Sequence, residues 1–240
     1  MFALFMFDPL YLLMVGPTIL LALWASFKVQ STFREYQQFG VRSGMNGAEA
    51  ARAVAHAGGA MDVTIEETDG FLSDHYDPTS KTLRLSPDVY HGRSISAIAV
   101  AAHEAGHAIQ HAKAYTWLTF RSQMVPMVKI GSMLWVWVFL AGMLISSMPR
   151  LTTVGPWLTT VGIILFSATV VFQLVTLPVE FDASNRAKAV LAHTGIVSTQ
   201  EEAMGVSKVL GAAAMTYVAG ALTAIMTLLH LFLRSRSSNE

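Results

Sequence analysis

Hydrophobic residues gather in four long runs along the chain, and polar stretches separate these runs. Each run holds about 18–25 residues, the length that an α-helix needs to cross the hydrocarbon core of a bilayer. The pattern therefore predicts four transmembrane helices, at residues 9–27, 124–148, 153–177 and 209–233. The polar stretches 28–123 and 178–208 are expected to lie outside the hydrocarbon.

The longer polar stretch contains patterns typical of both helices and strands. Residues 46–59 place small apolar residues at helical spacing and end at two glycines, which predicts a short helix. Residues 62–68 and 81–86 alternate in the manner of strands, and the sequence DPTSK before the second has a turn composition. We expect these two strands to form a small antiparallel sheet. Helical periodicity returns over residues 94–111.

Composition agrees with a membrane protein. The chain of 240 residues is 53% hydrophobic and only 13% charged, and its mean hydropathy is +0.47. This small number of polar side chains cannot coat the surface of a soluble protein. We therefore expect lipid to cover part of the molecule. The formal net charge is zero, which provides no basic surface for nucleic acid. The absence of cysteine leaves imidazole, carboxylate or water as ligands for any metal.

The basic residues are distributed unevenly between the two sides of the predicted spans. Nine Lys and Arg residues lie between the first and second spans, and three more follow the third, so twelve of the sixteen share one side. Cytoplasmic segments of membrane proteins carry an excess of Lys and Arg. We therefore expect the two polar stretches to be cytoplasmic.

The segment AVAAHEAGHAIQHA, residues 99–112, contains the pattern H-E-x-x-H. On a helix His103 and His107 project from one face, one turn apart, so both imidazoles can reach one Zn²⁺ ion. Glu104 lies beside the open coordination position and can take a proton from zinc-activated water. The alternative is a pair of hydrogen-bonded core histidines. Burying three polar groups without a metal would cost several kcal/mol, so we favour a hydrolytic zinc site.

A third zinc ligand is expected from a carboxylate elsewhere, because His111 is about 12 Å from His103 along the helix axis. Glu180 and Asp182 directly follow the third span, and Pro178 is placed to begin a new helix there. Glu180 is our candidate ligand, with an interfacial charge as the alternative. We expect Asp182 to orient a histidine ring. His111 is a candidate for proton handling or substrate contact, or simply a solvated side chain.

Two blocks of sequence closely resemble the neutral zinc metallopeptidase family of bacterial membrane proteins, the YugP-like group. These blocks are DHYDPTSKTLRLSPDVYHGRSISAIAVAAHEAGHAIQHA, residues 74–112, and LPVEFDASNRA, residues 177–187. The resemblance covers essentially the whole chain. It implies one zinc ion with His103 and His107 as ligands, Glu180 as the third ligand and Glu104 as the catalytic base.

The family is distantly similar to the HtpX and prenyl-protein (CAAX) membrane peptidases, whose third-ligand segment reads E-x-x-x-D. In this chain Ser184 stands four residues after Glu180, so no carboxylate from that position can contact a histidine. Asp182 and Asn185 are the alternatives for such a contact.

These observations predict a mainly α membrane protein whose four transmembrane helices carry a cytoplasmic α+β zincin-like domain with a small antiparallel sheet. The expected parts are a first transmembrane helix (1–27), a cytoplasmic catalytic region (28–123), a transmembrane hairpin (124–177), a cytoplasmic segment with the third ligand (178–208), and a fourth transmembrane helix with a tail (209–240). We expect the strand at 81–86 either to bind substrate through a free edge or to form a plain structural hairpin.

The predicted function is that of a membrane-integrated zinc endopeptidase in a bacterial inner membrane, with its site at the cytoplasmic surface. Its partners would be a protein or peptide substrate and the lipid bilayer; a homo-oligomer is left open. One alternative is a site-2-type intramembrane protease, but the L-D-G motif of such enzymes is absent. The other is a non-catalytic metal-binding scaffold or transporter, although a transport path would require ionisable residues inside the spans.

Overall fold

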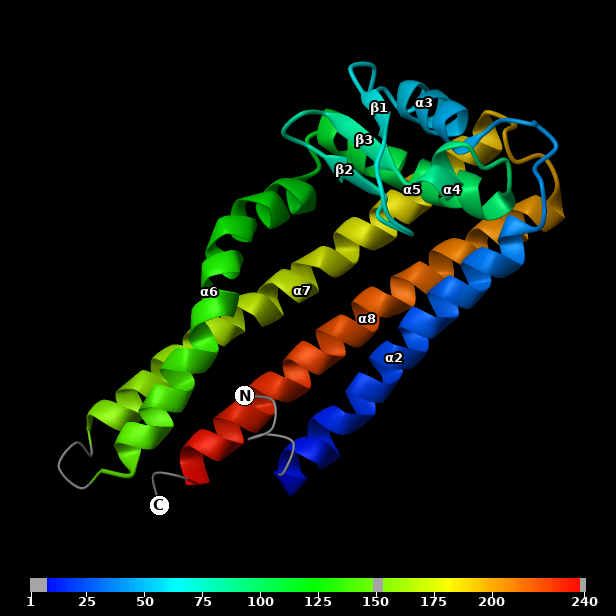
Figure 1. Ribbon diagram of the computed structural model, residues 1–240. Helices are drawn as coiled ribbons and strands as arrows, with labels where there is room; N and C mark the ends of the chain where they lie inside the picture. Colours follow the sequence, from blue (N-terminus) through cyan, green and yellow to red (C-terminus); the bar gives the residue numbers. More distant parts are fainter. Residues whose placement is uncertain (1–7, 149–152, 238–240) are drawn as a thin grey trace. The chain divides into compact units, whose positions relative to one another are not determined.

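The computed structural model of the protein describes residues 8–148 and 153–237 and is mainly helical (Figure 1). Its elements are, in order, α2 (Pro9–Gln37), α3 (Gly47–Ala57), β1 (Thr64–Glu67), β2 (His75–Asp77), β3 (Thr82–Leu85), α4 (Pro87–Tyr90), α5 (Ile95–Ala112), α6 (Thr116–Ser146), α7 (Val154–His193) and α8 (Gln200–Ser237). The chain forms two compact units. The helical unit comprises Met1–Trp24, Phe120–Leu177 and Tyr217–Glu240, and the site unit comprises Ala25–Thr119 and Pro178–Thr216.

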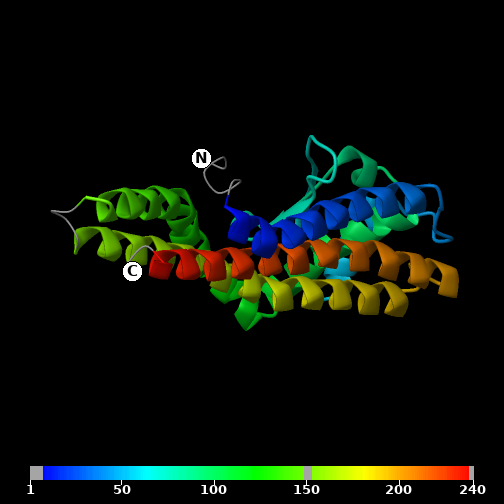
Figure 2. The ribbon, with the colours of Figure 1, turned by 90° about the horizontal axis from the view of Figure 1, so that it is seen from below.

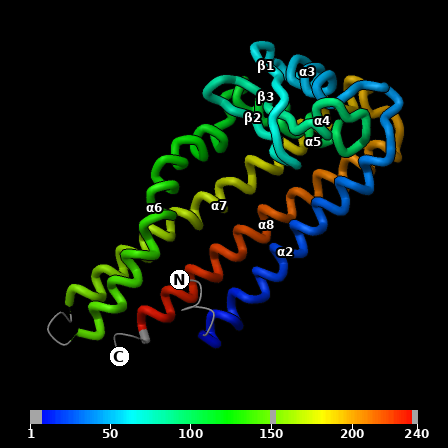
Figure 3. Tube along the Cα trace, viewed as in Figure 1, coloured from blue at the N-terminus to red at the C-terminus, as the bar shows by residue number. Residues whose placement is uncertain are grey.

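Four long helices carry the hydrophobic runs. Among the described residues, α2, α6, α7 and α8 are the helices long and apolar enough to cross a membrane, which confirms the prediction of four apolar helices. Each helix continues beyond its hydrophobic run into the neighbouring polar stretch, as the continuous traces in Figure 3 show. Hydrophobicity marks only the part of a helix that lipid can surround, so it underestimates the full length.

Within the helical unit, α6 and α7 pack closely in antiparallel directions, side by side in Figure 2. Gly142 faces the backbone of Thr159, and Gly155 faces Ser146, with no room for a Cβ atom at either glycine. Small residues allow helices to approach closely where lipid removes the hydrophobic drive for association. The connection between the two helices at residues 149–152 lies outside the described residues.

The expectation that Pro178 begins a new helix is wrong, because α7 runs through it without interruption. A proline inside a helix removes one hydrogen bond and costs about 3 kcal/mol. Burial on the far side of the proline offsets this cost: Val179, Ala183, Ala187 and Leu191 follow at four-residue spacing and are all buried in the site unit. A row at this spacing forms one face of a helix.

The sheet is mixed rather than antiparallel, with strand order β1-β3-β2. Strands β1 and β3, which correspond to the expected pair at 62–68 and 81–86, run parallel. Strand β3 pairs in antiparallel fashion with β2, a short strand that the alternation of residues did not reveal. The turn composition of DPTSK therefore belongs to the β2–β3 hairpin and not to a β1–β3 hairpin.

This topology overturns the expectation that the strand at 81–86 presents a free edge to substrate. Strand β3 is the central strand, and its two edges are hydrogen-bonded to β1 and β2. Edge pairing requires unpaired main-chain groups. Only the outer strands of this sheet, β1 and β2, can offer them.

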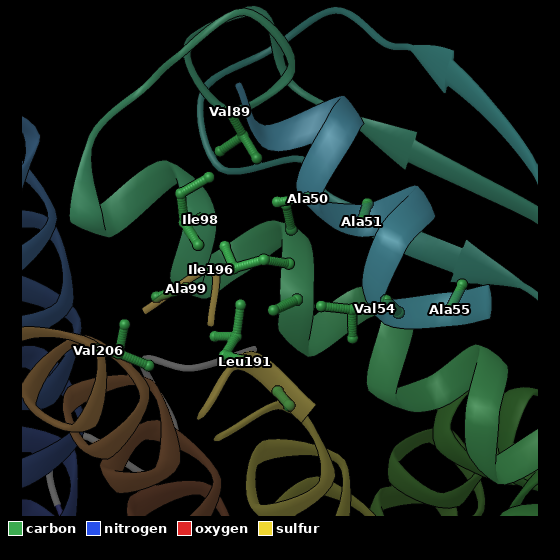
Figure 4. Close-up of a cluster of buried hydrophobic side chains, with 14 of the residues drawn as sticks. Ala50, Ala51, Val54, Ala55, Val89, Ile98, Ala99, Leu191, Ile196 and Val206 are labelled. Carbon is green, nitrogen blue, oxygen red and sulfur yellow. The ribbon is translucent and has the colours of Figure 1, made fainter. Parts of the chain in front are cut away.

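The core of the site unit consists mainly of small and branched residues from α3, α5, α7 and α8 (Figure 4). Ala51, Val54 and Ala55 of α3 lie against α5, while Leu191 of α7 and Val206 of α8 enter the same cluster. The small alanine side chains allow these helices to pack closely. Helix α5 shares this core with α3, α7 and α8. The candidate site residues on α5 therefore lie on a helix that is buried in the core of the site unit.

Caps fix the ends of the two helices that were predicted in the polar stretch. The Asn46 side chain accepts a hydrogen bond from the Glu49 amide, and the Glu49 side chain accepts one from the Asn46 amide, a reciprocal capping box at the start of α3. The Ser94 hydroxyl accepts a bond from the Ala97 amide at the start of α5. Both helices begin where the sequence predicted them.

Candidate metal centre

Helix α5 carries both histidines of the H-E-x-x-H pattern on one face. The imidazole rings of His103 and His107 meet edge to face, with centroids 4.8 Å apart, as expected for residues one turn apart. His103, Glu104 and His107 are each only 8% exposed. Three groups with strong hydrogen-bonding requirements are thus held together away from bulk water.

Glu180 of α7 meets the two histidines. Its Oε2 atom lies 3.2 Å from His103 Nε2 and 3.4 Å from His107 Nε2. The carboxylate is 4% exposed, so it is not a solvated interfacial charge. Residues separated by more than seventy positions therefore converge on one point within the site unit.

The three side chains fit a zinc ion. Bonds of about 2.0–2.1 Å in a tetrahedral site place neighbouring ligand atoms roughly 3.3–3.4 Å apart. The two contacts of Glu180, at 3.2 and 3.4 Å, are close to this length, and one ligand atom from each of His103, His107 and Glu180 lies within 4.8 Å of the others. Two imidazoles and one glutamate also form the ligand set of one class of catalytic zinc site.

The charge of Glu180 favours a cation at this position. Burial by itself would raise the pKa of the Glu180 carboxyl, but hydrogen bonds and the charges of His103 and His107 outweigh burial and hold the pKa well below its usual range. The carboxylate is therefore ionised in a water-poor environment, where a positive partner is strongly stabilising.

Helices α5 and α7 approach closely because of Gly106, which lies between the two histidines. A Cβ atom at Gly106 would collide with the backbone carbonyl of Ala183. A glycine at this position leaves room for a neighbouring helix. That neighbour is α7, and the close approach brings Glu180 within reach of the imidazoles.

Ser184 contacts the histidine at the position where the E-x-x-x-D pattern would place an aspartate. Its Oγ atom lies 3.0 Å from His103 Nδ1, and the contact is buried. A hydroxyl can donate or accept this bond. The partner of His103 at this position is therefore a neutral hydroxyl group.

Gln110 is a site residue that the sequence analysis missed. Its side chain is completely buried, and its Oε1 atom lies 3.0 Å from His107 Nδ1. Its Nε2 atom donates to the Val179 carbonyl and to Asp182 Oδ2, each at 2.8 Å. The only signal in the sequence is its position three residues after His107, which places both on one face of the helix.

We expected Asp182 to orient a histidine ring directly, but in the structure the side chain of Gln110 lies between Asp182 and the ring of His107. Asp182 bonds to Gln110, which in turn contacts His107, and it also pairs with Arg186. The alternative Asn185 is exposed. Within the described part of the chain, no hydrogen bond joins its side chain to either histidine.

His111 lies one turn beyond His107 on α5 and lines a cavity. Its Nδ1 atom is 2.8 Å from the Tyr76 hydroxyl of β2. Both side chains line a cavity of about 510 Å³, together with Lys81 and Met61. His111 is thus neither a ligand nor fully solvated, and its predicted role in substrate contact stays a prediction.

The surroundings of Glu104 contain a second carboxyl group, Asp74, which the sequence analysis did not identify. Asp74 accepts hydrogen bonds from the Ser86 amide and hydroxyl. Burial raises the pKa of Asp74, and the nearby negative charge of Glu104 adds to this rise. The charge of Glu104 is thus felt by a second, partly buried carboxyl group.

Comparisons with known proteins show the family of the chain. Residues 11–236 match the family described as "Putative neutral zinc metallopeptidase". The chain is 49% identical over 222 residues to "Putative membrane protease YugP" of Bacillus subtilis, an alignment that covers 91% of this chain and 95% of the relative. No solved structure matches significantly. The chain belongs to the neutral zinc metallopeptidase family.

Proposed function

We propose that this protein is a zinc-dependent endopeptidase integrated in the membrane, with its active site at the cytoplasmic surface. The observation that carries the proposal is the convergence of Glu180 Oε2 with the Nε2 atoms of His103 and His107. Membership of the family supports peptide hydrolysis. The relative described as a membrane protease, together with four apolar helices, supports a multi-pass location.

The chemistry follows from the side chains on the two helices. His103, His107 and Glu180 would hold zinc, which when bound supplies a Lewis acid that makes nearby water more acidic and polarises a carbonyl group. Glu104 is the base: its carboxylate accepts a proton from the attacking water and delivers it to the departing amine. The nearly complete burial of these residues strengthens each of these electrostatic interactions.

Two features support a site near the membrane surface on the cytoplasmic side. Glu180 follows Leu177, the last residue of the third hydrophobic run, by three residues. The polar stretches that carry the candidate site also contain twelve of the sixteen basic residues, and such an excess is typical of cytoplasmic segments.

A site-2-type intramembrane protease is less consistent with these features. Helix α5, which carries the motif, is not among the four described helices long and apolar enough to cross a membrane. Most of its residues are instead buried in the protein core of the site unit. The other alternative, a non-catalytic metal-binding scaffold, is separated from a peptidase by the activity measurement described next.

The test compares zinc content and casein cleavage in the wild type and Glu104→Gln. The amide fills the same space but cannot accept a proton, so we expect full zinc content and a loss of activity of about 10²–10⁴-fold. Glu201→Gln, at an exposed glutamate of α8, is the matched control and should retain activity. Activity of Glu104→Gln close to that of the wild type would contradict the base. Bound zinc in a wild type that cleaves nothing would favour the scaffold.

A further inference from the structure

Gln110 is the most deeply buried polar side chain near the candidate site. It is 0% exposed and bridges α5 to α7 through three contacts. Burying an amide is costly unless its donors and acceptor are all satisfied. In this position they are satisfied by a histidine of the metal site and by two groups that flank Glu180.

The partners of Gln110 determine which way its amide points. The Val179 carbonyl and Asp182 Oδ2 are both acceptors, so the group that faces them, 2.8 Å away from each, must be the NH₂ group. The amide oxygen therefore faces His107 Nδ1 at 3.0 Å. If the amide were flipped, its oxygen would face two other acceptors, the Val179 carbonyl and Asp182 Oδ2.

The orientation of the amide fixes the proton on His107. An amide oxygen can only accept, so Nδ1 of His107 must carry the hydrogen. In the neutral ring, the form that binds a metal, the lone pair is then on Nε2, the atom that faces Glu180 Oε2 at 3.4 Å. The charged ring that lowers the pKa of Glu180 carries a proton on Nε2 instead. A lone pair and a carboxylate oxygen repel each other unless a positively charged species lies between them.

His103 lacks such a constraint. Its Nδ1 atom contacts the Ser184 hydroxyl, which can act as donor or acceptor and so accommodates either tautomer. The two histidines, equivalent in the H-E-x-x-H pattern, are thus held differently. Only His107 has its tautomer imposed by its neighbour.

The same amide also holds the part of α7 that carries Glu180. Val179 immediately precedes Glu180 in sequence, and Asp182 follows two residues later. Asp182 is held in turn by Arg186, whose guanidinium lies over the Tyr115 ring at 5.4 Å. The network therefore extends from the imidazole, through Gln110, to a cation on the next turn of α7.

We propose that Gln110 is a positioning residue that both sets the metal-binding tautomer of His107 and fixes the place of Glu180 on α7. This inference rests on the proposed function only in that the site binds zinc. One side chain then prepares ligands from two helices at once. Partners of metal ligands typically contribute about 10–100-fold to metal affinity.

The test uses the full-length protein in detergent and measures zinc affinity by competition with a chelator. Gln110→Met retains approximate volume but removes all three hydrogen bonds, and we expect zinc affinity to fall about 10–100-fold. Ser184→Ala is the matched control at the other histidine, and its loss should be smaller. A Gln110→Met protein that folds and binds zinc within about twofold of the wild type would overturn the proposal.

A rescue experiment separates positioning from packing. Gln110→Glu keeps an acceptor for His107 but places carboxylate oxygens against both Asp182 and the Val179 carbonyl. The double variant Gln110→Glu with Asp182→Asn lets the new Asn amide donate to the new carboxylate and restores the hydrogen bond to residue 182, whereas the contact with the Val179 carbonyl is equally unfavourable in both variants. We expect the double variant to bind zinc more tightly than Gln110→Glu alone, with thermal unfolding as the control for folding. No recovery of affinity would contradict the network.

Nitrogen NMR of the histidines in the zinc-loaded wild type provides a readout independent of any variant. We expect His107 to show a slowly exchanging Nδ1 proton and coordination through Nε2. Coordination through Nδ1 would overturn the proposal even if Gln110→Met fails to fold. Peptidase activity is measured separately, so zinc binding that depends on Gln110 in a protein without activity would refute the proposed function alone.

Discussion

Glu180 is the residue on which the candidate site depends, because His103 and His107 supply only two ligands. An interfacial glutamate would be solvated and removable, whereas Glu180 is buried against both imidazoles. Its low pKa reflects an ionised carboxylate held between them. At this position charge, burial and geometry all favour a cation.

Glu180→Ala should therefore reduce zinc affinity and activity together. Loss of a direct ligand is expected to exceed the about 10–100-fold effect of an outer partner, so we expect a loss of at least about 100-fold in affinity, measured against a competing chelator. Glu201→Ala, at an exposed glutamate of α8, should change neither. Unaltered zinc affinity in Glu180→Ala would transfer the role of third ligand to another residue.

The sequence predicted some of these residues and not others for a physical reason. The spacing of His103 and His107 is local, so helical geometry alone places them on one face. Gln110 shares that face, but its partners Val179 and Asp182 are about seventy positions away. Their approach depends on how α5 and α7 pack, which no local pattern encodes.

At the scale of elements, the site depends on the close approach of α5 and α7. Gly106 lies against the carbonyl of Ala183, and this contact is between the histidine pair and the turn that carries Glu180 and Ser184. A glycine in a helix interior costs about 0.5–1 kcal/mol relative to alanine. The close packing of α5 against α7 explains why a glycine occupies this position despite that cost.

Gly106→Ala should therefore destabilise the protein although alanine is the better helix former. Overpacking at a tight interface costs about 1–3 kcal/mol, and separating the helices should also weaken zinc binding. Gly211→Ala, in α8, is the matched control because no neighbouring atom lies within 4 Å of the added Cβ. We expect the thermal unfolding temperature in detergent to fall for Gly106→Ala only. Equal behaviour of the two variants would contradict this account.

Predictability differs among the elements according to how local their determinants are. Helices α3 and α5 begin at the side-chain caps Asn46 and Ser94, next to local helical patterns that start at the same residues in the sequence. Strand β2 has only three residues, too few for alternation to be recognised, so the topology of the sheet was predicted wrongly. Helix α7 passes through Pro178 because of buried contacts beyond it, which a local helix rule does not include.

At the scale of the whole molecule, the distribution of charge predicts an orientation in the membrane that the net charge does not reveal. The chain is neutral overall, yet the polar stretches that carry the candidate site hold most of its Lys and Arg residues. The positive-inside rule counts basic residues near the ends of spans and does not depend on net charge. We therefore expect the candidate site to face the cytoplasm.

Cysteine labelling tests this orientation without interference, because the chain has no native cysteine. Ser80 is exposed in the β2–β3 hairpin. Ser80→Cys removes the bond from its hydroxyl to Asp77, but the bond from the Thr79 amide to Asp77 remains and should preserve the turn. We expect an impermeant thiol reagent to label this variant only after the cells are permeabilised.

Ser147→Cys is the matched variant for the opposite side, because Ser147 is exposed just beyond the end of α6. A single apolar helix separates it in sequence from the polar stretch that contains Ser80, so the two positions should respond oppositely. We expect Ser147→Cys to be labelled in intact cells. If instead Ser80→Cys is labelled in intact cells and Ser147→Cys is not, the orientation is inverted and the substrate must be sought outside the cytoplasm. The zinc ligands would be unchanged in that case, because they depend on α5 and α7 within one unit and not on the side of the membrane that this unit faces.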